Sequence, residues 1–298
     1  MANDQYTFAD PSTLYRGIET TEEYQAGPGL DAELENRADL GEKTYRGTGR
    51  LNGRKALVTG GDSGIGAATA IAFAREGADV ALSYLPEEEQ DAQRIVSLIT
   101  EAGRKAVALP GDLTDAGYCR DLVAKAVDEL GGLDILVNNA GKQQHVEALT
   151  DLSDEQFDLT YKTNVYAMFL VTKAALPHLA PGSTIINTSS IQAYQPSENL
   201  VDYASTKAAI NNFSKGLAQQ LAPKGIRVNV VAPGPIWTPL QTAGGQPTED
   251  LPEFGQSTPL GRPGQPAELA PAYVFLASSE SSYVSGSTLH VNGGMPTP

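Results

Sequence analysis

Tyr203 and Lys207 are the two residues whose types and spacing point most directly to chemistry. They lie four positions apart, so on a helix the phenol and the ammonium would share one face. A phenol has a pKa of about 10 and is a poor base at neutral pH, whereas a nearby cation favours the phenolate and lowers that pKa. Such a pair can give a proton to a carbonyl oxygen and take it back in the reverse reaction. The spacing alone is a weak signal, because one such pair arises easily by chance.

Other polar and glycine-rich segments are expected beside this pair. Ser190 follows a short apolar segment thirteen residues before Tyr203, where its hydroxyl could hydrogen-bond a substrate oxygen. An Asn-Asn-Ala-Gly segment at residues 138–141 and a Pro-Gly-Pro-Ile segment at residues 233–236 each end a predicted strand. Ligands of an open parallel sheet bind beyond the carboxyl ends of its strands. We therefore expect all these groups to line one cleft.

A glycine-rich turn at residues 59–66 (Thr-Gly-Gly-Asp-Ser-Gly-Ile-Gly) joins the first predicted strand to the first predicted helix. Residues without a Cβ let the backbone approach a pyrophosphate, and the following helix N-terminus offers free N–H groups to that anion. The turn could also be only a tight strand–helix joint. Its place in the first βα unit favours a dinucleotide site.

The end of the second predicted strand carries Tyr84, and no Arg or Lys stands beside it. An NAD site often has an acid here, whereas an NADP site places a basic residue nearby. Three glutamates follow at residues 87–89, and their negative field would oppose a 2′-phosphate. They could instead only favour the start of the next helix. The pattern favours NAD over NADP. Asp112 could border the adenine or cap a helix.

Strand and helix signals alternate from Leu51 onward, which predicts βαβ units and a parallel sheet. The expected strands are residues 55–59, 80–84, 106–109, 135–138, 184–188, 227–232 and 288–291. The expected helices are residues 65–76, 87–102, 115–130, 154–179, 203–221 and 266–277. These elements fit one doubly wound α/β domain of the Rossmann type, with about seven strands flanked by helices.

Composition excludes several classes of protein. The chain of 298 residues carries 21 basic and 36 acidic residues, a net charge of −15, which argues against a nucleic-acid partner and a polybasic membrane anchor. No apolar run reaches the length of a membrane span, and the N-terminus lacks a signal pattern, so we expect a cytoplasmic protein. One cysteine and three scattered histidines predict no metal site.

The first 50 residues differ from the rest and are predicted to be an irregular N-terminal extension of the domain formed by residues 51–298. Up to Gly41 the segment holds nine acidic and two basic residues, a net −7, and shows no periodicity. It could be a solvated, partly disordered tail or an arm draped over a neighbour. Its tyrosines, such as Tyr45, could anchor it against another subunit.

Together these motifs resemble the short-chain dehydrogenase/reductases, and the resemblance covers roughly residues 51–295. It is carried by residues 59–66, residues 138–141, Ser190, the Tyr203–Lys207 pair and Pro233-Gly234. The glycine turn preceded by a long arm resembles the bacterial stress-associated oxidoreductases with N-terminal extensions. The resemblance implies a homotetramer.

The resemblance also implies roles. Tyr203 would be the acid/base, Lys207 would bind the nicotinamide ribose and lower the Tyr203 pKa, Ser190 would orient the carbonyl, and Asn164 would complete a proton relay. The implied cofactor-binding residues are Gly60, Asp62, Ser63, Gly64, Ile65, Gly66, Tyr84, Asp112, Leu113, Asn139, Ala140, Gly141, Tyr203, Lys207, Pro233, Gly234, Ile236 and Thr238. Tyr84 departs from the acid that many NAD-dependent members carry there.

The sequence therefore predicts an NAD(P)-dependent oxidoreductase that interconverts a carbonyl compound and an alcohol by hydride transfer. Residues 240–254, rich in Pro, Gly, Gln and Thr, would form a mobile lid that shapes the substrate pocket. The alternative is a catalytically silent nucleotide-sensing protein of the same fold.

Overall fold

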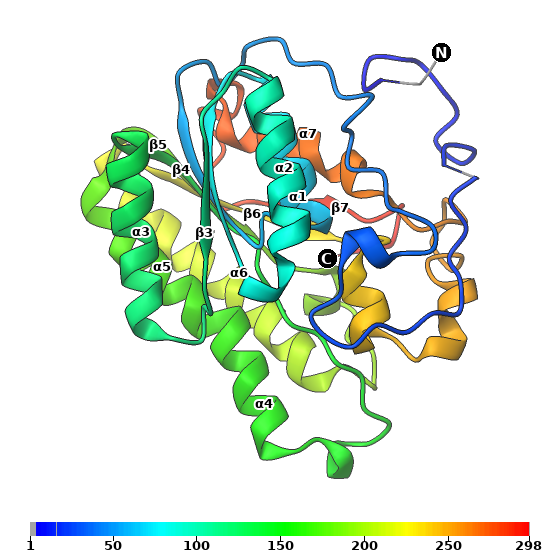
Figure 1. The fold of residues 1–298 in the computed structure, drawn as a ribbon. Helices are drawn as coiled ribbons and strands as arrows, with labels where there is room; N and C mark the ends of the chain where they lie inside the picture. Colours follow the sequence, from blue (N-terminus) through cyan, green and yellow to red (C-terminus); the bar gives the residue numbers. More distant parts are fainter. Residues whose placement is uncertain (1–3, 16, 298) are drawn as a thin grey trace.

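A seven-stranded parallel sheet forms the centre of the computed structural model, which describes residues 4–15 and 17–297. The strand order is β3-β2-β1-β4-β5-β6-β7 (Figure 1). The strands are β1 (Lys55–Thr59), β2 (Asp79–Tyr84), β3 (Ala106–Pro110), β4 (Leu133–Asn138), β5 (Leu179–Thr188), β6 (Arg227–Pro233) and β7 (Thr288–Val291). The predicted fold class is confirmed. No described helix has both the length and the apolar character needed to cross a lipid bilayer.

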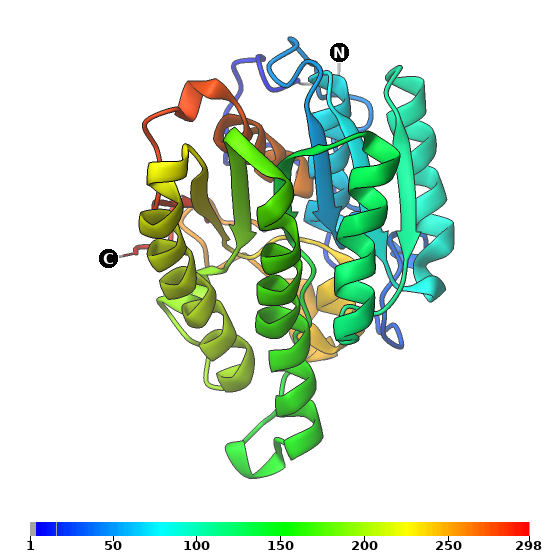
Figure 2. The same ribbon diagram turned by 90° about the vertical axis from the view of Figure 1, so that its left-hand side faces the viewer.

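Helices cover both faces of the sheet, which explains why the central strands are almost continuously apolar. They are α1 (Gly64–Arg75), α2 (Glu89–Glu101), α3 (Ala116–Leu130), α4 (Asp154–Tyr161), α5 (Ala167–Ala175), α6 (Val201–Leu221) and α7 (Pro266–Ala277). One core joins α1, α2 and α7 to one face, and a second joins α3, α5 and α6 to the other. Figure 2 shows α4 extending beyond the edge of the sheet.

The longer helical region predicted from about residue 154 to residue 179 is confirmed, but it is not one regular α-helix. Between α4 and α5 the chain makes a π-helical turn at Lys162–Tyr166, and a 3₁₀ turn at Leu176–His178 contains Pro177. A π turn inserts one extra residue and re-aims the side chains that follow it, so such turns are frequent at functional sites. The turn carries Asn164, whose contacts are described below.

The order of the strands reverses between β1 and β4, which pair with each other in parallel. The connections leave this point in opposite directions and open a crevice beyond the carboxyl ends of the strands. The glycine turn after β1 and the Asn-Ala-Gly segment after β4 both lie here. The topology thus brings together segments that are about 80 residues apart in sequence.

The N-terminal extension packs against the rest of its own chain. Glu76 at the end of α1 is buried and accepts hydrogen bonds from the Tyr45 hydroxyl, the Thr48 N–H and the Arg50 guanidinium. Although burial raises the pKa of Glu76, these donors outweigh it and hold the pKa at about 2. Tyr45 is therefore an intramolecular anchor, which corrects the expectation that it holds a second subunit. The boundary at residue 50 stays a prediction.

A second contact of the extension forms a buried group of carboxyls, which we call the acidic cluster: Asp31, Asp62, Glu88 and Asp91. The Asp91 carboxylate of α2 accepts the N–H groups of Asp31, at 2.6 Å, and Ala32, at 3.1 Å. Burial, with the charge of Asp91 second, raises the pKa of Asp31 to about 7, although Arg94 partly opposes this. Burial also raises the pKa of Asp62 to about 7 and that of Glu88 to about 8. Folding of the chain therefore takes up protons at these carboxyls.

We expect the free energy of unfolding to fall as the pH rises from about 5 to 8. A carboxyl whose pKa is raised by folding holds a proton that the unfolded chain has already released in this pH range. Folding therefore becomes less favourable as the pH rises. The largest loss of stability for one carboxyl is about 4 kcal/mol when its pKa is raised by three units. Urea unfolding across this range measures the slope.

Asp31→Asn removes one of these titrations without changing side-chain size and should flatten the slope. Asp151→Asn, an exposed carboxyl far from the cluster in sequence, is the control. A slope that is the same in Asp31→Asn and in the wild type would contradict the assignment.

Candidate active site

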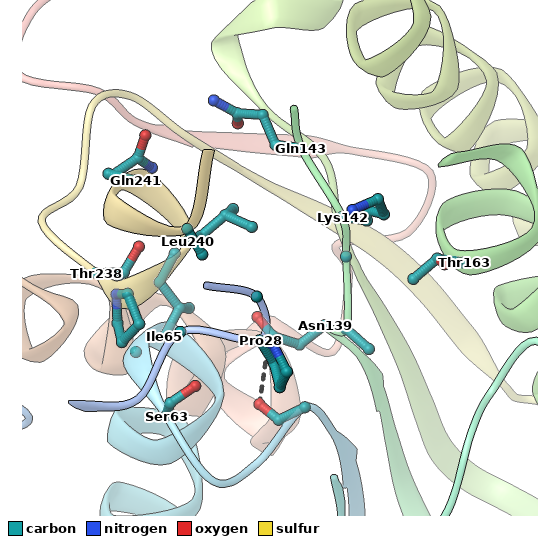
Figure 3. A pocket seen from close by; sticks show the side chains of 18 of the residues that line it. Pro28, Ser63, Ile65, Asn139, Lys142, Gln143, Thr163, Thr238, Leu240 and Gln241 are labelled. Atoms are coloured by element: carbon teal, nitrogen blue, oxygen red, sulfur yellow. Dashed lines mark hydrogen bonds between the residues drawn. The ribbon is translucent and has the colours of Figure 1, made fainter. Parts of the chain in front are cut away.

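A cleft of about 870 Å³ lies at the carboxyl edge of the sheet, above the reversal of strand order. Figure 3 shows Ser63, Ile65, Asn139 and Thr238 around it. Of the residues predicted from sequence, those lining it are Gly60, Asp62, Ser63, Gly64, Ile65, Tyr84, Asp112, Leu113, Asn139, Ala140, Gly141, Ser190, Tyr203, Lys207, Pro233, Gly234, Ile236 and Thr238. The two others, Gly66 and Asn164, lie just behind its wall.

The glycine turn has room for backbone only. Gly60 has φ +60°, and a Cβ on it would lie 3.0 Å from the Cα of Ala140. A Cβ on Gly66 would lie 1.8 Å from the Gly60 carbonyl oxygen, so Gly66 permits the close approach of α1 to the turn. Helix α1 begins at Gly64, and its first N–H groups lack side-chain capping by Ser63. This cradle fits the pyrophosphate of a dinucleotide.

Hydrogen bonds hold the turn against the segment after β4. The Thr59 hydroxyl accepts the N–H groups of Asn139, at 3.0 Å, and Ala140, at 3.1 Å. The Asn139 side chain in turn donates to the Gly60 carbonyl at 3.0 Å. These bonds fix the two glycine-rich segments relative to each other across the reversal point.

Helix α6 presents Tyr203 and Lys207 to the cleft, as their spacing predicted. Both side chains are buried, with exposed fractions of 6% for Tyr203 and 3% for Lys207. The Lys207 ammonium donates to the Thr188 carbonyl at 3.0 Å and lies 5.3 Å from the centre of the Tyr203 ring. The carbonyl at the end of β5 thus fixes the position of the cation.

The expected lowering of the Tyr203 pKa by Lys207 is not found in the chain alone. Burial raises the pKa of Tyr203 to about 12, and a hydrogen bond with Ser190 offsets only part of that rise. Burial also lowers the pKa of Lys207 to about 8. The reason is that taking both groups out of water disfavours both charged forms. In this state Tyr203 is a protonated phenol.

Ser190 follows β5 and caps the short 3₁₀ turn Ile191–Ala193, where its hydroxyl accepts the Gln192 N–H at 3.1 Å. This bond orients the hydroxyl beside the Tyr203 phenol. Asn164, in the π turn, accepts the Lys142 N–H at 2.7 Å and donates to the Lys142 carbonyl at 2.9 Å. It therefore braces the segment after β4 that carries Gly141, whose Cβ position would lie 3.5 Å from the Lys207 ammonium.

The end of the cleft beside β2 has an acidic rim. Asp62 and Glu88 of the acidic cluster line it, and the Tyr84 hydroxyl donates to Glu89 at 2.8 Å. Asp112 lines the cleft and accepts the Thr114 N–H at 2.8 Å in a local turn. The cap of α3 is Asp115, so the helix-cap interpretation of Asp112 is wrong, and a contact of Asp112 with adenine stays a prediction. Among the described lining residues, Lys142 and Lys207 are the two that carry an ammonium or guanidinium group.

Several other lining residues were not singled out by the sequence analysis, although it predicted that residues 240–254, which include Gln241 and Gln246, shape the pocket. The opposite end of the cleft carries the amide side chains of Gln143, Gln144, Gln192, Gln241 and Gln246. Tyr24, Gly27, Pro28 and Gly29 of the N-terminal extension line the cleft too. His145 also lines it, and its ring Nδ1 lies 3.1 Å from the Gly244 carbonyl oxygen. Isolated glutamines and an aperiodic arm give no motif by which to find them.

A family model and several curated proteins match most of this chain. The family model described as enoyl-(acyl carrier protein) reductase matches residues 60–296. The uncharacterized oxidoreductase YghA of Escherichia coli (strain K12) is 60% identical over 285 residues, 96% of this chain and 97% of that protein. General stress protein 39 of Bacillus subtilis (strain 168) is 50% identical over 267 residues, 90% of this chain and 93% of that protein. The resemblance to stress-associated oxidoreductases is confirmed.

Two further matches have informative descriptions. NADPH-dependent aldehyde reductase 1, chloroplastic, of Arabidopsis thaliana is 43% identical over 275 residues, 90% of this chain and 95% of that protein. The crystal structure of a short chain dehydrogenase from Burkholderia cenocepacia J2315 in complex with NADP superimposes with a TM-score of 0.76 at 37% identity, covering 82% of this chain and 98% of that one. This chain belongs to the short-chain dehydrogenase/reductase family of NAD(P)-dependent oxidoreductases.

Proposed function

We propose that this oxidoreductase interconverts an aldehyde or ketone and an alcohol, with Tyr203 as the acid/base. The observation that carries the proposal is the convergence of Tyr203, Ser190 and Lys207, all buried, on one cleft beside a phosphate-binding turn. A bound nicotinamide supplies the hydride to the carbonyl carbon in one direction and accepts it in the other.

The chain's own residues handle the proton. In the reducing direction the Ser190 hydroxyl donates a hydrogen bond to the substrate carbonyl oxygen, and the Tyr203 phenol transfers its proton to that oxygen as the alcohol forms. The protonated state of Tyr203, favoured by burial, suits this role. The Lys207 ammonium, held by the Thr188 carbonyl, stabilises the phenolate that remains and hydrogen-bonds the nicotinamide ribose. Asn164, braced against Lys142, is proposed to hold the water that returns the proton.

We propose a preference for NAD over NADP on charge alone. The cleft beside β2 offers carboxyls and no described cation to a 2′-phosphate. The pKa of Asp62 is raised to about 7 and that of Glu88 to about 8, so both carboxyls are partly protonated near neutral pH and ionise as the pH rises. The Burkholderia relative was solved with NADP, so this preference would distinguish the two proteins.

We propose that the substrate is a small, hydroxylated carbonyl compound. Five glutamines line the cleft, and their amide groups can recognise hydroxyls. The Gln241 side-chain oxygen is buried and accepts no hydrogen bond from another described residue. A substrate hydroxyl would supply the missing donor. The Arabidopsis relative is named as an aldehyde reductase, which favours an aldehyde.

We also propose that the protein associates with copies of itself. Helices α4, α5 and α6 and the π turn between α4 and α5 expose large side chains, those of Phe157, Leu159, Tyr166, Phe169 and Val201. An apolar surface of this kind is suited to a subunit interface, as a homotetramer would require.

Tyr203→Phe should lower kcat for aldehyde reduction by roughly a thousandfold, because the proton donor is lost while the ring still packs. Tyr161→Phe is the matched control, since Tyr161 also hydrogen-bonds a residue of α6, Ser205, but lies outside the cleft lining. Initial rates with an aldehyde and ketone panel, and nicotinamide fluorescence for binding, measure both variants. Wild-type rates in Tyr203→Phe would remove its role, and binding without turnover in the wild type would support a nucleotide-sensing protein instead.

Glu88→Gln should lower the ratio of kcat/KM with NADH to kcat/KM with NADPH about tenfold at pH 8. The reason is that the substitution removes a carboxylate beside the position of a 2′-phosphate. Glu87→Gln makes the same change in charge at an exposed neighbour that does not line the cleft, and it should leave the ratio unchanged. In the wild type this ratio should rise from pH 6.5 to 9, because Asp62 and Glu88 ionise over that range. An NADPH preference in the wild type would refute the proposal on the cofactor.

Gln241→Leu should raise KM for glyceraldehyde about tenfold and leave KM for propanal nearly unchanged, because the amide would bond the substrate hydroxyl. The control is Gln219→Leu, an exposed glutamine of α6. Equal changes for the two aldehydes would mean that Gln241 does not recognise a hydroxyl.

A further inference from the structure

A short loop of the N-terminal extension, residues 24–31, enters the cleft and has no assigned role. We call it the extension loop. Its residues Tyr24, Gly27, Pro28 and Gly29 are part of the cleft wall. The family model begins at residue 60, so the extension lies outside the part of the chain that defines the family.

The extension loop is closed by its own side chains. The Gln25 amide oxygen accepts the Leu30 N–H at 2.6 Å, and its amide nitrogen donates to the Leu30 carbonyl at 3.3 Å. Gln25 is buried. The Gly27-Pro28-Gly29 tip is therefore held as a defined turn, and Figure 3 shows Pro28 inside the cleft among Ser63, Ile65 and Asn139.

The loop is attached on both sides of the phosphate-binding turn. On one side the Gln25 N–H donates to the Thr242 carbonyl at 3.0 Å. A Cβ on Gly29 would lie 2.7 Å from the Pro239 carbonyl oxygen, so only glycine fits this contact. On the other side the Asp31 N–H donates to Asp91 of α2 at 2.6 Å. The loop thus bridges residues 239–243 and α2 across the start of α1.

The extension also holds the segment that follows β6. Trp237 is fully buried and donates its indole N–H to the Asn36 carbonyl at 2.7 Å. Leu34 and Ala38 pack with Trp237 and Leu251 in a third apolar cluster. In Figure 1 the blue extension runs beside the gold and orange segment of residues 240–254. The expected lid is thus fastened to the extension.

The tip offers hydrogen-bond donors that the rest of the described chain does not use. Neither the Gly27 N–H nor the Gly29 N–H donates to another described residue. The N-terminus of α1, whose first N–H groups favour an anion, lines the same cleft as this tip.

We propose that the extension loop completes the dinucleotide site by closing over the pyrophosphate and by fixing residues 239–243 as the adjoining wall. This inference rests on the proposed function, because it requires that a dinucleotide binds in the cleft. The loop excludes water from the phosphates, and its attachments slow the release of the cofactor.

Two variants of the full chain test the loop. Gly29→Val forces it away from Pro239, and Gln25→Ala opens it while keeping the Gln25 N–H bond to Thr242. Gly17→Val is the control, because a Cβ at Gly17 meets no atom within 4 Å. Kd and the dissociation rate are measured with NADH, and in parallel with NADPH, by nicotinamide fluorescence and stopped-flow displacement.

Both loop variants should raise Kd and the dissociation rate about tenfold, because a preorganised contact is lost, and the control should match the wild type. Unchanged constants in both variants, with a wild type that binds, would overturn the inference and leave the proposed function standing. Tighter binding would overturn it as well, by showing that the loop obstructs the site. A wild type that binds neither dinucleotide would defeat the proposed function itself.

ADP-ribose and adenosine separate a contact with phosphate from a general distortion. The loop variants should weaken ADP-ribose binding and leave adenosine binding unchanged in calorimetric titrations. Equal losses for both ligands would show that the variants merely disturb the fold, and the pyrophosphate contact would be rejected.

Discussion

The removal of Tyr203 and Lys207 from water is the constraint on which the site depends. Burial raises the pKa of the phenol and lowers that of the ammonium, so the chain alone holds Tyr203 protonated. That state suits proton donation to a carbonyl. Forming the phenolate in the reverse direction needs positive charge in the same dry space, which Lys207 supplies from its position on the Thr188 carbonyl. The rest of the cleft keeps this charge in place.

Hydrogen bonds between polar side chains and the backbone position the segments around the cleft. Thr59, Asn139 and Gly60 lock the ends of β1 and β4 together through three hydrogen bonds. Asn164 does the same for the segment after β4, and it can reach that segment because a π turn re-aims it. These contacts tie the phosphate-binding turn to the helix that carries Tyr203 and Lys207.

The N-terminal extension packs as an integral part of the fold. Its contacts run to Glu76 at the end of α1, to Asp91 on α2 and to Trp237 after β6. At the contact with Asp91, the buried carboxyls of Asp31 and Asp62 have raised pKa values and are partly protonated near neutral pH. Two members of this cluster, Asp62 and Glu88, line the cleft beside β2, so the docking site of the extension adjoins the charges that face the cofactor.

The sequence by itself determined the fold class, the edge of the sheet where ligands bind and most of the residues that line the cleft. The fold class follows because alternating strands and helices are compatible with few topologies. The glycine turn and the Tyr203–Lys207 pair can be recognised because their residues lie close together in the sequence at fixed spacings. Only the tertiary structure decided that the pKa of Tyr203 rises in the chain alone, since desolvation depends on what surrounds a group in three dimensions. It also decided the π turn at Asn164, the amide-lined end of the cleft and the path of the extension. Those depend on contacts between residues far apart in sequence, such as Gln25 with Thr242 and Asp31 with Asp91, which no local periodicity encodes.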